Sequence, residues 1–290
     1  MFHTTWNHSL TSVIDWATFC AKQMPLNGHI QTSYNATSKE WSSPQVVAGT
    51  DITISGLSPG LNYGQQCYEG LKASRTIDGR IVIFRPEFHA ARMRRSAESV
   101  VLCPPPEDLF LECIRRAVVE NVEYVPPYGS GGFMYIRPVL FGASTALWGL
   151  PNESILAVFV SPTVPQVKRG GVSALVCEEF DRSAPKGMGS FKVGGNYAPV
   201  WRYVGKAAAM GYDAVLHLDS ATHSFVEEFS TSAFLGYRLS EDHRHVLVVP
   251  TSDTAIDSTM SNTLTQIAEH EGWIIEKAKV RLKLFINLHF

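Results

Sequence analysis

The segment GMGSFKVGGNYAP, residues 187 to 199, contains a lysine whose surroundings are unusual for a surface charge. Lys192 lies between Phe191 and Val193, and a Gly-Gly-Asn-Tyr turn follows it directly. Burial disfavours the charged form of a lysine, so a desolvated amine can be the neutral nucleophile that Schiff-base chemistry requires. Taken alone, the segment leaves two interpretations open, a reactive buried amine and an ordinary surface lysine, because most lysines are surface residues and Gly-Gly is often only a turn.

Two carboxylates follow in HSFVEEFSTSAF, which has the composition of a strand. Adjacent residues of a strand point to opposite faces, so one of Glu227 and Glu228 must point inward if the other points outward. An inward carboxylate needs a cationic partner or a proton. This pair is therefore a second candidate for chemistry.

Two further patterns could bind an anion, and both have a simpler explanation. The run Arg92, Arg94 and Arg95 in HAARMRRSA places basic side chains on more than one face of a helix, as a solvated surface does. The segment DSTMSNT resembles a helix N-terminus, whose hydroxyls can cap the helix and whose N–H groups can bind a phosphate. Each pattern alone favours the simpler explanation.

The elements that position these residues are clearest between residues 51 and 162. Two strands, around 69–76 and 80–84, join across Asp78-Gly79, which is a strong hairpin signal. Pro86 opens a helix, and apolar residues at helical spacing predict another from about 107 to 123. The segments FMYIRPVLFG and ILAVFVSP predict strands, and Pro138 indicates an edge or a strand end. Residues 1–50 indicate irregular connection.

The second half alternates short strands with two helices, at about 198–210 and 259–271, and Gly211 and Gly272 occupy the positions of C-terminal caps. The run of prolines and glycines between 162 and 171 predicts a domain boundary there. We therefore expect an α+β fold with two domains, 1–161 and 162–290. The first is a smaller α/β domain and the second a larger, β-rich, barrel-like domain.

Composition excludes several classes of function. The 290 residues include 45% apolar and 18% charged residues and carry a net charge of −2, so no basic field exists for nucleic acid or an anionic membrane. Five cysteines without a C-x-x-C pair argue against a disulfide framework and a zinc site. The N-terminal sequence lacks the features of a secretory signal or an Arg-rich presequence. A cytoplasmic location is expected, and a mitochondrial one is not excluded.

The order of the motifs resembles one known family. The segments NYGQQCYEGLKA, IVIFRPEFHAARMRRSA, YIRPVLFG, FKVGGNYA and VEEFSTSAF are similar to successive signatures of the class IV, fold-type IV pyridoxal-phosphate enzymes, and nearest to the branched-chain amino acid aminotransferases. The similarity spans about residues 60 to 280. It implies pyridoxal 5'-phosphate as cofactor and transamination between an apolar L-amino acid and 2-oxoglutarate.

The resemblance also implies roles for individual residues. Lys192 would form the Schiff base and act as general base and acid, Tyr197 would contact the cofactor's phenolic oxygen, and Glu228 would pair with its pyridine nitrogen. The phosphate would be bound by Arg92, Thr231 and the backbone of Thr259 and Met260. The substrate would be bound by Tyr63, Tyr68, Tyr135 and Arg137, the arginine receiving the side-chain carboxylate of glutamate.

Three departures from the family pattern stand out. Tyr68 replaces the usual phenylalanine and adds a hydroxyl to an apolar pocket. The usual L-P-G-x-T-R segment is IDSTMS, which lacks the glycine and places Asp257 near the phosphate. After about Val280 the chain ends in RLKLFINLHF, without the family's G-T-A element. From this ending we expect a truncated product that is impaired or poorly stable.

Two alternatives remain open at this point. One keeps the fold and changes the substrate, as in an aminotransferase of specialised metabolism with an unusual amino acid, or a D-amino acid or lyase relative; Tyr135-Ile136-Arg137 favours the L-branched-chain group over the last two. The other is an inactive, truncated relative that only binds. The family forms homodimers, so we expect at least a dimer, with small-molecule partners and no metal.

Overall fold

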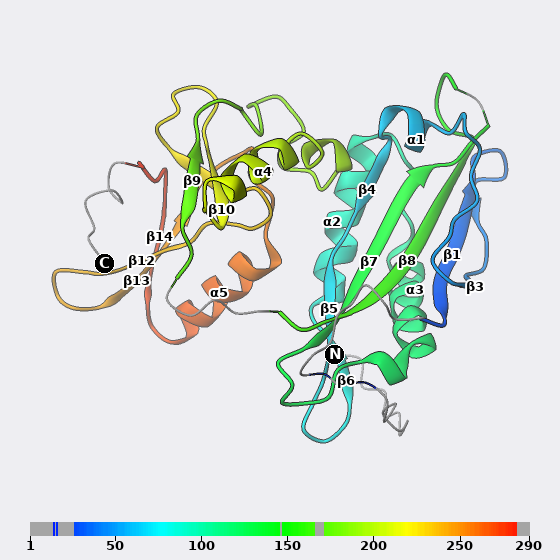
Figure 1. Ribbon diagram of the computed structural model, residues 1–290, viewed down its shortest axis with the longest axis horizontal. Helices are drawn as coiled ribbons and strands as arrows, with labels where there is room; N and C mark the ends of the chain where they lie inside the picture. Colours follow the sequence, from blue (N-terminus) through cyan, green and yellow to red (C-terminus); the bar gives the residue numbers. More distant parts are fainter. Residues whose placement is uncertain (1–13, 15, 17–25, 146, 166–170, 283–290) are drawn as a thin grey trace. The chain divides into compact units, whose positions relative to one another are not determined.

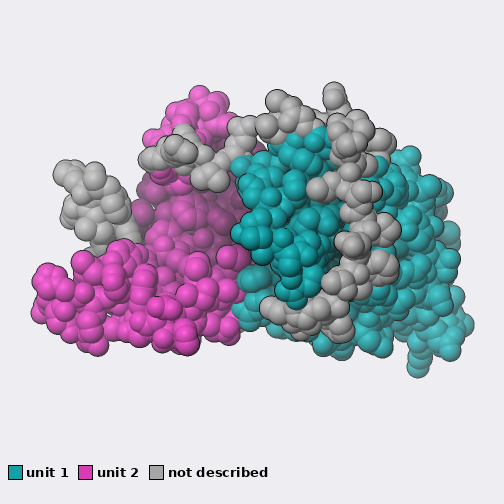
Figure 2. Space-filling view, turned by 90° about the horizontal axis from the view of Figure 1, so that it is seen from below, with its two compact units in different colours: residues 1–167 teal, residues 168–290 magenta. Residues whose placement is uncertain are grey.

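The computed structural model describes residues 14, 16, 26–145, 147–165 and 171–282. The predictions for the extreme N-terminal sequence and for nearly all of the final RLKLFINLHF lie outside these residues. The chain divides into two compact units, Met1–Val167 (unit 1) and Lys168–Phe290 (unit 2) (Figure 2). Strand β8 (Glu153–Thr163) runs past the expected boundary at 161/162. Among the described residues, no helix has the length and apolar character needed to cross a bilayer.

The described part of unit 1 contains an eight-stranded antiparallel sheet with helices α2 (Pro86–Ser99) and α3 (Glu107–Glu120) packed together on it (Figure 1). The main strand order is β2-β1-β8-β7-β5-β6, while β3 pairs with β1 and β4 pairs with β7. The remaining strands are β1 (Gly28–Asn35), β2 (Glu40–Trp41), β3 (Gln45–Ala48), β4 (Gln66–Tyr68), β5 (Leu71–Arg75), β6 (Ile81–Ile83) and β7 (Phe133–Gly142). A short helix α1 (Pro59–Tyr63) precedes β4, and a 3₁₀ turn (Val122–Tyr124) follows α3.

Most of the predicted elements of unit 1 are confirmed. Strands β5 and β6 form the predicted antiparallel hairpin, and Gly79 in its turn adopts φ +81°. Pro86 occupies the first turn of α2, where its missing N–H costs nothing. The core between helices and sheet is apolar, as Met93, Phe110 and Ile136 show by being almost fully buried.

Two predictions for unit 1 are wrong. The segment Gly28–Asn35 is not irregular connection but strand β1, which pairs with β8 in the body of the sheet. Pro138 is not at an edge or a strand end, because β7 pairs on both sides around it. The Pro138 carbonyl accepts a hydrogen bond from Glu69 N. Because the N and C=O of one strand residue point to the same side, the missing N–H of Pro138 faces the junction of β4 and β5, where the ladder is interrupted.

Unit 2 contains two three-stranded sheets in its described residues, β11-β10-β9 and β12-β13-β14. Their strands are β9 (Ala174–Cys177), β10 (Ala214–Leu218), β11 (Val226–Phe229), β12 (Gly236–Leu239), β13 (His245–Pro250) and β14 (Ile274–Ala278). Helices α4 (Trp201–Ala209) and α5 (Thr259–His270) are confirmed, and Gly211 and Gly272 after them adopt positive φ. The expected α+β, two-part fold is confirmed. Strand β14, parallel to β13, was not predicted.

Candidate active site

Lys192 lies on a short loop that its own backbone and side-chain contacts hold in place. A 3₁₀ turn (Gly194–Asn196) follows it, and the Asn196 amide donates to the carbonyl oxygens of Met188 at 2.6 Å and Phe191 at 2.9 Å. Lys192 is half-buried, and its Nζ donates to the Tyr197 hydroxyl at 3.0 Å. An amine and a phenol, the two groups predicted from the sequence, are thus adjacent.

Glu228 is the inward-facing member of the acidic pair, as the alternation of strand β11 requires. It is buried, whereas Glu227 is half-buried. Its Oε1 pairs with Arg182 Nη1 at 2.5 Å and accepts from Ile256 N at 3.2 Å. Burial raises the pKa of Glu228 to about 7, against the lowering effects of the Arg182 guanidinium, the Ile256 N–H and the Lys192 charge.

Arg182 was missed by sequence reasoning, although it connects the other groups. Its side chain is almost fully buried, and its guanidinium carbon lies 5.8 Å from the centre of the Tyr197 ring. Arg182 therefore touches both the buried carboxylate and the phenol beside Lys192. Nothing in DRSAP distinguishes this arginine from a surface one, because its partners come from distant parts of the chain.

His217, on strand β10 directly opposite Glu228, was also missed. Burial, and to a lesser extent the neighbouring Arg182 charge, together lower the pKa of His217 to about 4. The ring is therefore neutral at physiological pH, and its Nε2 bonds the Ser230 hydroxyl at 2.8 Å. A histidine inside the apolar run DAVLHLD is the signal that could have identified it.

Glu227 holds together the loops around the lysine. It accepts hydrogen bonds from Ser183 Oγ at 2.7 Å, Ser252 Oγ at 3.1 Å and Thr254 Oγ1 at 2.5 Å. Space there is tight, since a Cβ on Gly189 would lie 2.3 Å from Ser183 Cβ. Glu227 therefore holds neighbouring loops together through its hydrogen bonds. Glu228, in contrast, pairs with Arg182 and has a raised pKa.

The start of α5 is capped as the sequence indicates. Ser258 Oγ accepts from Ser261 N at 3.2 Å, Thr259 is buried and Met260 is 50% exposed. Thr231 is exposed, in the turn that follows β11. The phosphate-binding roles of Thr231, Thr259 and Met260 stay predictions.

Arg92 is not part of a solvated basic face. It is buried in unit 1, where its Nε donates to Glu69 Oε1 at 2.6 Å and its Nη2 donates to Glu69 Oε2 at 2.7 Å. His89 Nδ1 lies 2.6 Å from Glu69 Oε2. Desolvation raises the pKa of Glu69, but the hydrogen bonds from Arg92 and His89 outweigh it and lower the pKa to about 2.

The predicted substrate residues Tyr68, Tyr135 and Arg137 form one cluster in unit 1. Arg137 Nη2 donates to the Tyr135 hydroxyl at 2.7 Å, and its guanidinium carbon lies 4.7 Å from the centre of the Tyr68 ring. Its Nε donates to the Glu69 carbonyl at 3.0 Å. Tyr63, at the end of α1, instead packs its 54% exposed ring near that of Trp148, with centroids 5.7 Å apart.

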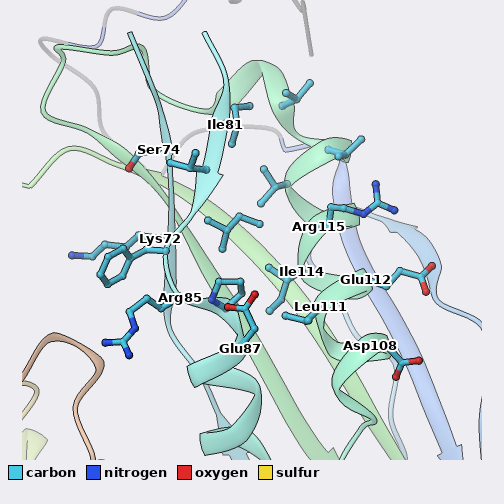
Figure 3. Close-up of a pocket in the computed structure, with 17 residues that line it drawn as sticks. Lys72, Ser74, Ile81, Arg85, Glu87, Asp108, Leu111, Glu112, Ile114 and Arg115 are labelled. Carbon is cyan, nitrogen blue, oxygen red and sulfur yellow. The ribbon is translucent and has the colours of Figure 1, made fainter. Parts of the chain in front are cut away.

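A groove of 780 Å³ also lies in unit 1, between the β5–β6 hairpin, the start of α2 and α3 (Figure 3). Aliphatic side chains, Ile81, Leu111 and Ile114 among them, line it (Figure 3). None of the predicted site residues lines this groove, so its size does not make it the catalytic site. Elsewhere among the described residues, no cluster of His, Cys, Asp and Glu could hold a metal ion.

Comparisons with known proteins identify relatives of this chain. The family model for amino-transferase class IV matches residues 66–288. The aminotransferase poxL of Penicillium oxalicum is 46% identical over 269 residues, covering 92% of this chain and 73% of that protein. The branched-chain amino acid aminotransferase gloG of Glarea lozoyensis is 38% identical over 271 residues, covering 92% of this chain and 75% of that protein.

The fold is found among solved structures as well. The branched-chain aminotransferase of the thermophilic archaeon Thermoproteus uzoniensis, solved with norvaline, superposes with a TM-score of 0.69 at 22% identity, covering 88% of this chain and 80% of that one. This likeness supports the fold alone, whereas the family match and the curated relatives extend to sequence. The chain belongs to the class IV aminotransferases.

Proposed function

We propose that this aminotransferase uses pyridoxal 5'-phosphate to move the amino group between an L-branched-chain or other apolar amino acid and 2-oxoglutarate. The observation that carries the proposal is the position of the Lys192 amine beside the Tyr197 phenol. The buried carboxylate of Glu228 lies near enough that the lysine charge acts on its pKa. When bound, pyridoxal 5'-phosphate supplies an aldehyde that condenses with amines and a protonated ring that accepts electrons.

The residues of unit 2 fit such a cofactor. Both polar contacts of the Glu228 carboxylate fall on Oε1, and Oε2 makes none with the described residues. Oε2 is thus available to a pyridine nitrogen, and a carboxyl with a pKa of about 7 can hold or release a proton there near neutral pH. Arg182 holds the opposite side of the same carboxylate.

The lysine and the tyrosine have complementary tasks in this proposal. Lys192 Nζ is the amine that would bond the cofactor aldehyde and, once the substrate amine has displaced it, would move the proton at the substrate Cα. The Tyr197 hydroxyl, 3.0 Å from Nζ, would orient the amine and donate to the cofactor's phenolic oxygen.

The cluster of unit 1 supports the substrate assignment. Arg137 offers a guanidinium fork fixed by the Tyr135 hydroxyl and the Glu69 carbonyl, and such forks bind carboxylates with defined geometry. Tyr68 and Tyr135 surround it with ring surface that suits an aliphatic side chain. A cluster of this kind can accept the glutamate side chain and an apolar side chain in turn.

A labelling experiment tests the cofactor assignment. The purified chain is incubated with pyridoxal 5'-phosphate, reduced with borohydride and digested, and we expect the phosphopyridoxyl group on the peptide that contains Lys192. Lys192→Ala should lose the label and all turnover, and Lys186→Ala, an exposed lysine on the same segment, should keep both. A label on another lysine, or turnover in Lys192→Ala, would refute the proposal.

A second candidate keeps the reaction and changes the substrate to an unusual amino acid of specialised metabolism. Tyr68 favours it, because its hydroxyl adds a polar group to a pocket where the family usually has only a ring. A panel of leucine, isoleucine, valine, D-alanine and amino acids with polar side chains decides. Leucine, isoleucine or valine as the best substrate supports the first candidate, a polar L-amino acid supports the second, and D-alanine refutes both.

We further propose that the protein acts as a homodimer inside the cell. The support is the resemblance of its motifs to a dimeric family. Light scattering on the purified full chain with cofactor should give twice the mass of one chain, and a monomer with full turnover would refute the dimer.

A further inference from the structure

Glu69 is a fully buried carboxylate that none of the roles above includes. It lies at the junction of β4 and β5, and its side chain is 0% exposed. Its two oxygens receive Arg92 Nε at 2.6 Å, Arg92 Nη2 at 2.7 Å and His89 Nδ1 at 2.6 Å. Gly70 N donates to Oε2 at 3.2 Å as well. Such a complete set of donors keeps the carboxylate ionised despite its burial.

The contact fixes the orientation of the Arg92 guanidinium. Two parallel hydrogen bonds from Nε and Nη2 define both the position and the plane of the fork. With that edge on Glu69, Nη1 points away from the carboxylate. His89, three residues earlier on the same helix, donates from Nδ1 to the same oxygen, because an ionised carboxylate can only accept.

The backbone of Glu69 is fixed independently of its side chain. Its N–H donates to the Pro138 carbonyl at 2.9 Å, and its own carbonyl accepts from Arg137 Nε at 3.0 Å. A change of the side chain therefore leaves the main-chain bond to Arg137 in place. The two arginines of unit 1 depend on different parts of one residue.

We propose that Glu69 is a positioning residue, which holds the Arg92 guanidinium in the orientation that binds the cofactor's phosphate. This inference rests on the proposed function, together with the contact between Arg92 and that phosphate which the family resemblance implies. An arginine has many rotamers, and a carboxylate bound to one edge of its guanidinium removes that freedom before the ligand arrives. The ion pair is neutral as a whole, so Arg92 contributes placed N–H donors more than net charge.

Comparing two ligands separates positioning from general stability. The apo full chain is titrated with pyridoxal 5'-phosphate and with pyridoxal, which lacks the phosphate, and the ratio of the two dissociation constants measures the contribution of the phosphate. Glu69→Asp keeps the charge but shortens the side chain by one methylene, so both bonds to Arg92 cannot be kept. We expect the ratio to fall about tenfold or more, with pyridoxal binding changed less than about threefold.

A second variant and a matched control complete the test. Glu69→Gln keeps the length and turns one acceptor into a donor that opposes Arg92 Nη2, so the ratio should fall again. If only net charge mattered, removing the negative charge would strengthen phosphate binding, and that result would overturn the proposal. Glu98→Asp, an exposed acid on the same helix as Arg92, should leave the ratio unchanged.

Two further readouts distinguish a purely structural role. In an Arg92→Lys background, Glu69→Asp should lower the ratio no further, because the group that it positions is gone. The KM for 2-oxoglutarate relative to that for an apolar 2-oxo acid should stay within about twofold, since the main-chain bond to Arg137 persists. If Glu69→Asp and Arg92→Lys lowered the ratio additively, Glu69 would not act through Arg92. If Glu69→Asp weakened the binding of pyridoxal and of pyridoxal 5'-phosphate equally, its effect would not concern the phosphate. Either result would refute the positioning role. A wild-type chain that binds pyridoxal as tightly as its phosphate would instead refute the cofactor assignment.

Discussion

The Tyr197 hydroxyl is the group most directly placed to act on Lys192. It accepts from Nζ at 3.0 Å, and the Arg182 guanidinium lies near the same ring. Tyr197→Phe removes this partner without changing the ring, so we expect kcat to fall about tenfold or more while the lysine still bonds the cofactor. Steady-state kinetics and borohydride labelling measure the two effects. Tyr203→Phe, whose ring stacks on Phe180, is the control, and an unchanged kcat in Tyr197→Phe would contradict this role.

Tyr68 is the residue whose substitution should alter substrate preference. Its ring lies under the Arg137 guanidinium at 4.7 Å, a contact that a phenylalanine ring can keep. Tyr68→Phe should therefore leave the KM for 2-oxoglutarate within about twofold. Removal of the hydroxyl should raise kcat/KM for leucine relative to polar amino acids by several-fold. A rise in kcat/KM for polar amino acids relative to leucine would show that the hydroxyl does not favour polar substrates.

At the scale of single residues, the sequence predicts the groups whose motif is local. Lys192 and Tyr197 lie five residues apart on one loop, and the alternation of strand β11 predicts that one of Glu227 and Glu228 is buried. Glu69 and Arg182 could not be assigned in this way. Their ion pairs join separate elements, so only the folded chain shows that each charge is buried and compensated.

At the scale of elements, the β4–β5 junction sets the shape of the substrate cluster. A Cβ on Gly70 would lie 2.2 Å from the Tyr135 hydroxyl, the group that receives Arg137 Nη2. Gly70→Ala must push this hydroxyl away, and we expect the KM for 2-oxoglutarate to rise about tenfold.

The specificity of that effect can be checked within the same assay. The KM for an apolar 2-oxo acid should rise less in Gly70→Ala, because such a substrate does not need the Arg137 fork. Gly205→Ala, in helix α4 where a new Cβ meets nothing, should leave both KM values unchanged and add up to about 1 kcal/mol of helix stability. Equal KM values in Gly70→Ala and the wild type would show that Tyr135 does not hold the arginine.

Periodicity predicted the helices better than the strands, for a physical reason. The stripe of apolar residues in α3 repeats on one face, and Phe110, Ile114 and Ala117 are indeed buried. Strand β1 has a polar sequence, and its partner strand β8 lies far along the chain, so no local pattern marks it. Pro138 is tolerated inside β7 because its partner ladder breaks there, which depends on tertiary structure.

At the scale of the whole molecule, each unit contains one buried glutamate with a shifted pKa, and the two shifts have opposite signs. In unit 1, the bonds from Arg92 and His89 overcome desolvation and lower the pKa of Glu69 from 4.5 to about 2. Its ionised form is favoured in the folded state, so it stabilises the fold above about pH 4.5. That contribution, about 3 kcal/mol, is lost as the pH falls toward 2.

Glu228 in unit 2 should contribute in the opposite direction. Burial raises the pKa of Glu228 from 4.5 to about 7, so the folded state favours its protonated form. Stability is then lost as the pH rises from about 4.5 to 7, again by about 3 kcal/mol. His217, whose pKa is lowered to about 4, contributes the reverse trend over much of the same range, so the Glu228 contribution is measured as the difference between the wild type and a variant that lacks the carboxyl.

Denaturant unfolding of the apo wild type and of its Gln variants between pH 3 and 8 should reveal both contributions. Glu228→Gln has the shape of the protonated carboxyl and does not titrate, so its stability lacks the Glu228 contribution to the pH dependence. Relative to Glu228→Gln, the wild type should lose stability as the pH rises from 5 to 7, and relative to Glu69→Gln it should lose stability as the pH falls below 4.5. Glu98→Gln should keep both. Parallel curves of unfolding free energy against pH for the wild type and Glu228→Gln above pH 5 would mean that Glu228 is ionised without cost in the folded apo protein. The proton that it is proposed to share with the cofactor would then have to come from another group.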